Sequence, residues 1–133
     1  MKEMVYSTER KREILDEGII DGFHYIILNL GWHPTAYVEI PKNHPYYKAG
    51  YDDIDIDIEV HGGLTYSGDM GKDGEWYLGW DYAHCEDYFG CVELYREALD
   101  LPEWTPEWTG KKWTTEEILE DVKTAIRQLK EVR

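Results

Sequence analysis

Apolar and polar residues alternate along much of the first two-thirds of the chain, a pattern typical of strands that bury one face. The region Arg12–Leu30 alternates in this way around Asp21-Gly22. This dipeptide is typical of two-residue hairpin turns, because both central residues of a type I′ turn need positive φ. We therefore predict two antiparallel strands joined at this turn. A competing interpretation is a first helix over Thr8–Glu17, which is charged and contains good helix formers.

Three further strands are predicted before residue 82. The first is Thr35–Ile40, which ends at Pro41. The second is Asp53–Val60, where acids alternate strictly with Ile or Val, so that all the apolar side chains share one face. This is the clearest strand pattern in the chain. The third is Glu75–Asp81, which follows a glycine-rich turn, and Leu64–Tyr66 is expected to be extended.

The C-terminal residues have the pattern of an amphipathic helix. Thr114 and Glu117 have the spacing of a capping box, and seven apolar residues then recur at helical spacing. These are Ile118, Leu119, Val122, Ala125, Ile126, Leu129 and Val132. The predicted fold class is therefore α+β, with a mainly antiparallel sheet and this helix packed on one face, in a single domain over residues 1–133. A short helix is also predicted within Asp87–Leu101, before an irregular tryptophan-rich stretch, Pro102–Gly110.

The formal net charge is −14, from 28 acidic and 14 basic residues. Nucleic acids and anionic membranes bind clustered Lys and Arg, so we predict no direct nucleic-acid binding and no membrane partner. The charge either keeps the protein soluble or imitates nucleic acid toward a basic protein, although the acids form no long row. Two cysteines, Cys85 and Cys91, are too few for a disulfide scaffold. No signal peptide and no apolar run of about 20 residues is present, so the expected location is the cytosol.

Polar residues gather after two of the predicted strands. His61-Gly62-Gly63 follows one strand, and a segment from Asp81 to Asp87 follows another. If these strands are neighbours, the two polar groups lie close together, and the paired glycines allow a sharp bend or leave room for a ligand. We therefore expect a pocket whose ligand-binding residues are His61, Gly62, Gly63, Thr65, Tyr66, Trp80, Asp81, His84 and Asp87.

Several chemical interpretations of this pocket stay open. Two histidines with aspartates suit a zinc or iron site, but neither H-x-x-x-H nor H-E-x-x-H occurs, and we predict no metal and no cofactor. A histidine oriented by an aspartate can act as a general acid or base. The imidazoles can also hold the bend by structural hydrogen bonds, or line a ligand pocket without chemistry. Catalysis is therefore left open, with binding favoured.

Three segments resemble a family of small, largely uncharacterised proteins encoded by phages and prophages. They are Pro41–Tyr47, Val60–Gly68 (V-H-G-G-L-T-Y-S-G) and Trp80–Asp87 (W-D-Y-A-H-C-E-D). The resemblance covers roughly residues 35–90 and the C-terminal helix, whereas Tyr88–Trp113 matches nothing in it. It implies a viral accessory protein in the cytosol of a bacterial host, and it carries no known reaction.

Small phage proteins of this kind include some that sequester the nucleotide signals of bacterial immunity. By that analogy we expect a counter-defence protein that binds a small nucleotide-like signalling molecule, with Tyr and Trp stacking on a base. One alternative is a metal- or His-dependent hydrolase acting on a small molecule. A second alternative is an acidic inhibitor of a nucleic-acid-binding host protein. Whether the chain forms a homo-oligomer is left open.

Overall fold

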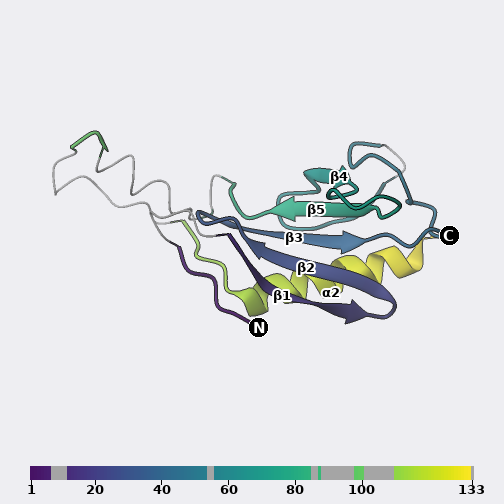
Figure 1. Ribbon diagram of the computed structural model, residues 1–133, viewed down its shortest axis with the longest axis horizontal. Coiled ribbons are helices and arrows are strands. Elements are labelled where there is room, and N and C mark those ends of the chain that lie inside the picture. The colour runs from purple at the N-terminus through teal and green to yellow at the C-terminus, as the bar shows by residue number, and fades with distance from the viewer. Residues whose placement is uncertain (7–11, 54–55, 85–86, 88–97, 101–109, 133) are drawn as a thin grey trace.

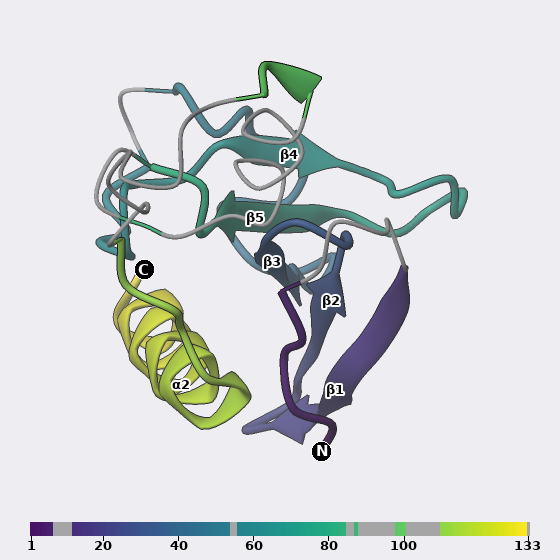
Figure 2. The same cartoon turned by 90° about the vertical axis from the view of Figure 1, so that its left-hand side faces the viewer.

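The computed structural model describes residues 1–6, 12–53, 56–84, 87, 98–100 and 110–132. Within these residues the chain forms one sheet, with strands in the order β1-β2-β3-β5-β4 and every neighbouring pair antiparallel. The helix α2 lies against one face of this sheet, which curves around it (Figures 1 and 2). The predicted α+β class is confirmed. The elements are β1 (Glu13–Ile20), β2 (Phe23–Asn29), β3 (Pro34–Glu39), β4 (Tyr66–Gly68), β5 (Tyr77–Asp81) and α2 (Thr115–Glu131).

The first two strands form the predicted hairpin. Asp21 and Gly22 have φ of 51° and 85°, as a type I′ turn requires at both central positions. Ile20 is paired with Phe23 directly across this turn. The competing prediction of a helix over residues 8–17 is wrong where the structure describes it, because β1 begins at Glu13. The first part of that predicted helix falls in residues 7–11, which lie outside the described residues.

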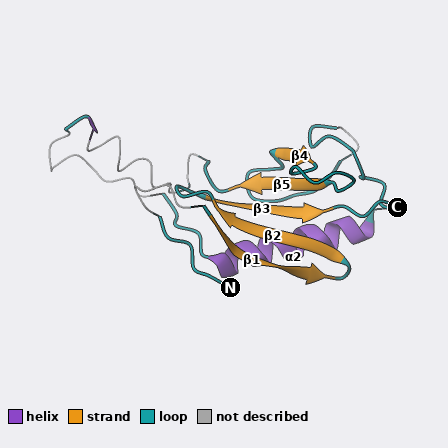
Figure 3. Ribbon diagram, viewed as in Figure 1, coloured by secondary structure: helices purple, strands orange, loops and turns teal. Residues whose placement is uncertain are grey.

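The C-terminal helix begins at the predicted cap. The Thr114 side chain accepts a hydrogen bond from the Glu117 N–H at 3.2 Å, and the Glu117 carboxylate accepts one from the Thr114 N–H at 3.1 Å. Five side chains of the predicted apolar stripe are fully buried: Ile118, Val122, Ala125, Ile126 and Leu129. They share one core with Tyr82, which follows β5, and with the strand residues Leu15, Tyr25, Ile27, Ala36, Val38, Leu78 and Trp80. The helix contacts β1, β2 and β3, and Figure 3 shows it running along the sheet.

The prediction of a strand over Asp53–Val60 is wrong. Residues 56–60 belong to no strand, and residues 54–55 lie outside the described part of the chain. The backbone N–H and C=O of Glu59 instead bond to the side-chain amide of Gln128, both at 2.7 Å. Ile58 is nevertheless buried in the core. The alternation therefore identified the buried face correctly, but the backbone bonds to a helix side chain and not to a neighbouring strand.

Two other sequence predictions fall mainly outside the described residues. These are the short helix within residues 87–101 and the tryptophan-rich stretch 102–110. In the part of the chain that the structure does describe, no helix is long and apolar enough to cross a bilayer.

Candidate functional site

The bend after Val60 is a tight turn that requires glycine. The Gly63 N–H donates to the Val60 carbonyl at 2.9 Å, and Gly62 has φ of 68°. A positive φ at the third residue is typical of a type II turn and favours glycine there. A Cβ on Gly62 would overlap the His84 imidazole, whereas a Cβ on Gly63 would meet no atom of the described residues within 4 Å. The His84 ring therefore fills the space beside Gly62, and the expected room for a ligand lies beside Gly63 instead.

Asp87 is a buried carboxylate at the centre of the cluster. It is 1% exposed and accepts hydrogen bonds from His61 Nε2 at 2.7 Å, from Trp113 Nε1 at 2.8 Å and from the His84 N–H at 3.0 Å. Burial alone would raise the pKa of Asp87, but the hydrogen bonds from His61, the His84 N–H and Trp113 outweigh it and lower that pKa. Asp87 is therefore ionised, and an ionised carboxylate can only accept hydrogen bonds. When His61 is neutral, its proton must therefore lie on Nε2, the nitrogen that faces Asp87.

Aromatic rings hold the His61 imidazole in place. It is stacked on Tyr82, with ring centroids 5.0 Å apart and planes inclined by 4°, and the Trp113 ring lies 4.6 Å away. Tyr82 is itself fixed, because its hydroxyl donates to Asp121 at 2.6 Å and accepts from Trp80 Nε1 at 3.0 Å. Burial raises the pKa of Tyr82 well above its usual range, and the bond to Asp121 adds to this. The His61 ring is thus rigidly positioned by neutral aromatic neighbours.

Asp81 and Thr65 form a second polar group on the other side of His84. Thr65 Oγ1 donates to Asp81 at 3.1 Å, and the Ala83 N–H donates to the same carboxylate at 3.1 Å. His84 Nε2 lies 3.4 Å from Asp81, and the His84 ring lies 5.5 Å from the His61 ring. The His84 ring therefore lies between the pair formed by His61 and Asp87 and the pair formed by Thr65 and Asp81.

Two of the nine predicted residues lie apart from this cluster. Tyr66 packs edge-to-face on Tyr37 at 5.5 Å, and its hydroxyl accepts a hydrogen bond from the Met70 N–H. Trp80 is buried in the core beneath α2. The cluster is thus packed around His61, Asp87 and His84, and Tyr66 and Trp80 lie outside it.

A groove runs beside the cluster, between the loop that carries His61 and the helix α2. Its volume is about 490 Å³. Among the residues predicted for the site, His61 is the one that lines it. The described residues that line it are Glu59, Val60, His61, Asp121, Thr124, Arg127, Gln128 and Glu131. A neighbouring cavity of about 380 Å³ shares Glu59, Gln128 and Glu131 and continues along the helix.

The helix residues of this groove were missed by the sequence prediction. Asp121, Thr124, Gln128 and Glu131 recur at three- and four-residue intervals, so the sequence places them on one polar flank of the helix. That spacing indicates a shared flank but does not say which loop the flank meets. Trp113 was likewise missed, because it precedes the helix and is far in sequence from His61.

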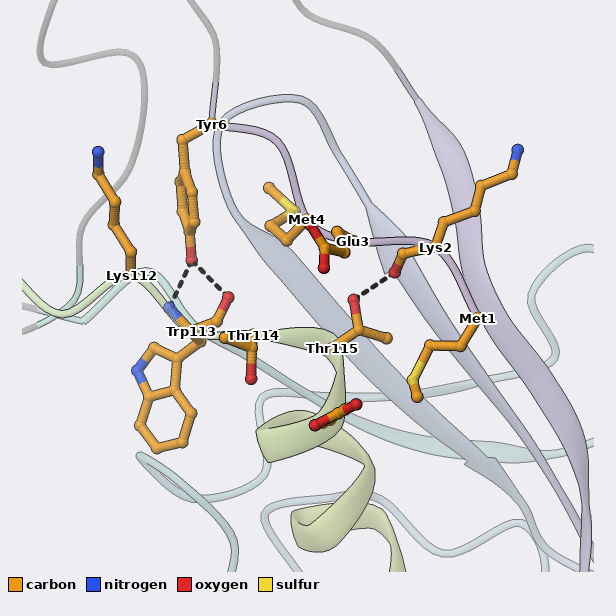
Figure 4. Close-up of a pocket in the computed structure, with 10 residues that line it drawn as sticks. Met1, Lys2, Glu3, Met4, Tyr6, Lys112, Trp113, Thr114 and Thr115 are labelled. Atoms are coloured by element: carbon orange, nitrogen blue, oxygen red, sulfur yellow. Dashed lines mark hydrogen bonds between the residues drawn. The ribbon is translucent and has the colours of Figure 1, made fainter.

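Another cavity, of about 370 Å³, lies between the N-terminal residues and the start of α2 (Figure 4). Tyr6 and Trp113 close one side, where the Trp113 N–H donates to the Tyr6 hydroxyl at 2.9 Å. On another side, Thr115 Oγ1 donates to the Lys2 carbonyl at 2.6 Å. The lining mixes two methionines, two lysines and two acids, and it contains none of the nine predicted residues. The backbone of Trp113 thus lines this cavity while its indole contacts His61.

Metal ligation was also considered from the geometry. Within the described ranges, which leave out Cys85 and Cys91, no group of three or more His, Cys, Asp or Glu is placed to hold a metal ion. His61 instead bonds to Asp87, and Asp81 and Asp87 both accept hydrogen bonds from backbone N–H groups.

Comparison with known proteins identifies no relative. The chain matches no model of a protein family, no curated protein and no solved structure.

Proposed function

We propose that the chain is a small-molecule binding protein whose ligand occupies the groove beside His61. The observation that carries this proposal is the placement of the His61 ring. Asp87 holds its Nε2 atom, Tyr82 stacks on one face, and the ring lines a cavity large enough for a small ligand. Rigid polar groups at a cavity wall bind ligands well because little entropy is lost on binding.

The groove favours a ligand that carries hydroxyl or amino groups. The carboxylates of Glu59, Asp121 and Glu131 are hydrogen-bond acceptors, and so is Nδ1 of neutral His61. Among the described residues of the lining, Arg127 is the one Lys or Arg. Several phosphates would be repelled by the three carboxylates, whereas a ribose, an amino base and at most one phosphate suit this surface. A nucleoside-like part of a nucleotide-derived signal is therefore the proposed ligand.

In a bacterial host cell, such a protein would act by sequestration. A phage accessory protein that removes an immune signal from solution needs tight binding and no turnover. The resemblance of the His61 and Asp81–Asp87 segments to phage proteins supports this role by analogy.

Calorimetric titration with nucleosides, mononucleotides and cyclic dinucleotides tests the proposal. We expect binding of one of these classes, and a loss of at least about tenfold in affinity on Arg127→Gln or Glu131→Gln. Lys123→Gln is the matched control, because Lys123 is exposed on the same helix and pairs with Glu120 outside the groove. Equal affinity in all four proteins would contradict a ligand site in the groove.

A second candidate function is hydrolysis of the same ligand. The pairing of His61 Nε2 with Asp87 leaves Nδ1 as the nitrogen that can accept a proton from water. The water oxygen would bond to a phosphorus or carbonyl carbon of the ligand while the bond to the leaving group breaks. His61 would then return the proton to the leaving group. Mass spectrometry of the ligand after incubation separates the two functions: a binder returns it intact, whereas a hydrolase yields products that His61→Gln abolishes.

A further inference from the structure

Among the described strands, β1 has β2 as its one neighbour, so its other edge is free of a paired strand. Ile20 and Phe23 close a two-residue turn, so the hydrogen-bonded pairs of the hairpin are Ile20 with Phe23 and Gly18 with Tyr25. Glu17 and Ile19 alternate with them and direct their N–H and C=O groups away from β2. In the described part of the chain, no segment bonds to these outward groups; the Lys2 N–H reaches the edge farther along, at the Leu15 carbonyl.

Two apolar side chains flank this edge on the face of the sheet opposite α2. Ile19 is 73% exposed and Ile14 is 47% exposed. Ile19 is paired with His24, whose neighbours Phe23 and Tyr25 point into the core beneath the helix, so Ile19 lies on the opposite face. A free edge with exposed β-branched side chains is a surface that can pair with another strand.

The same face is acidic. Glu17 and Glu39 lie 3.9 Å and 3.4 Å from the His24 ring nitrogens. The Tyr77 hydroxyl donates to Glu75 at 2.7 Å. Among the described residues, none of these three glutamates forms a salt bridge with Lys or Arg.

We propose that the free edge of β1 binds an extended, basic segment of another protein by β-strand addition. Main-chain hydrogen bonds would join that segment to Glu17 and Ile19, with a basic side chain near Glu17 and an apolar one near Ile19. The net charge of −14 attracts a basic partner and disfavours a second copy of the same chain. This surface is separate from the ligand groove, which lies beside α2 on the other side of the sheet.

The probe is an end-capped, eight-residue peptide in which pairs of lysines alternate with pairs of valines, so that each face of the extended peptide carries both residue types. Binding is followed by fluorescence anisotropy. We expect saturable binding that slows hydrogen exchange of the Glu17 and Ile19 amides. Ile19→Pro removes one outward N–H, which an edge strand tolerates, and we expect it to weaken binding at least about tenfold. Glu17→Lys should weaken binding similarly. Asp52→Lys is the matched control, because it makes the same charge change near β4, at the opposite edge of the sheet.

Three results would overturn the proposal. Equal weakening by Asp52→Lys and Glu17→Lys would show attraction by bulk charge alone. Should Ile19→Pro not fold, the same peptide with alternate amides N-methylated replaces it, and undiminished binding of that peptide would exclude strand addition. A concentration-dependent dimer in sedimentation, without peptide binding, would assign the edge to a second copy. Titration of the groove ligand against Glu17→Lys should give unchanged affinity, so each site is tested separately.

Discussion

Gln128 and Glu59 exchange two hydrogen bonds. The Gln128 side-chain amide donates to the Glu59 carbonyl at 2.7 Å and accepts from the Glu59 N–H at 2.7 Å. A neighbouring strand would offer the same donor and acceptor, so the glutamine replaces a strand at this position. It ties the loop that carries His61 to α2 and lies in the wall of the groove.

Gln128→Leu should loosen this loop. The substitution keeps the side-chain size but removes both hydrogen bonds, and water replaces them only partly. We expect the free energy of unfolding to fall by about 1–3 kcal/mol in urea titrations. Exchange of the Glu59 amide should become faster than in the parent. Lys123→Leu, on an exposed position of the same helix, is the control and should change stability by less than about 0.5 kcal/mol. Equal effects of the two substitutions would contradict a specific role of Gln128.

The two glycines of the bend should differ in their tolerance of alanine. Both have positive φ, which costs an L residue roughly 1–2 kcal/mol. At Gly62 the added methyl group would also overlap the His84 ring, so we expect Gly62→Ala to cost about 2–4 kcal/mol in total. Gly63→Ala is the matched control, with the backbone cost alone. If the two variants unfold at the same denaturant concentration, His84 does not pack against Gly62 as described.

Asp87→Asn should destabilise the protein in a pH-dependent way. The pKa of Asp87 in the folded protein is below the ordinary value of 3.8. A carboxylate with a lowered pKa contributes its stability fully above the unfolded-state pKa and loses it as the pH falls through the folded-state pKa. We therefore expect the free energy of unfolding of the variant to be roughly 3 kcal/mol lower than that of the parent at pH 7. This difference should become smaller below pH 3.8. Urea unfolding of both proteins between pH 3 and 7 measures the difference. The exposed Asp52→Asn should show no such narrowing.

Ile126→Ala should cost about 2–4 kcal/mol, because it leaves a cavity in the fully buried interface between α2 and the sheet. Thermal and chemical unfolding measure the loss. Arg127→Ala changes the exposed neighbour and should have little effect on stability. A loss below about 0.5 kcal/mol for Ile126→Ala would place the apolar stripe against solvent or another chain.

Local signals explain which elements the sequence predicts well. The hairpin follows from Asp21-Gly22, and the helix start follows from Thr114 with Glu117, because the residues that decide these structures are adjacent. The Asp53–Val60 alternation shows which side chains are buried. It contains no information about the backbone partner, which is a glutamine 69 residues away.

The candidate site is likewise predicted only in part from the sequence. His61, Asp81, His84 and Asp87 were predicted to meet at the ends of two neighbouring strands. They do lie together, although residues 56–60 before His61 belong to no strand. The indole of Trp113 and the groove residues of α2 reach His61 only through the packing of distant segments. The sequence therefore predicts the polar cluster but neither its aromatic surroundings nor the cavity beside it.

Asp87 and Lys111 form a parallel β-bridge, and Trp113 donates to the Asp87 carboxylate. Lys111 and Trp113 lie just before the Thr114 cap, so these two contacts fix the start of α2 to the polar cluster. Asp87 also holds the His61 ring, so the helix start and that ring share one anchor. Loss of the bond between Trp113 and Asp87 should therefore loosen both together, and the cluster and the helix start are expected to open as one unit.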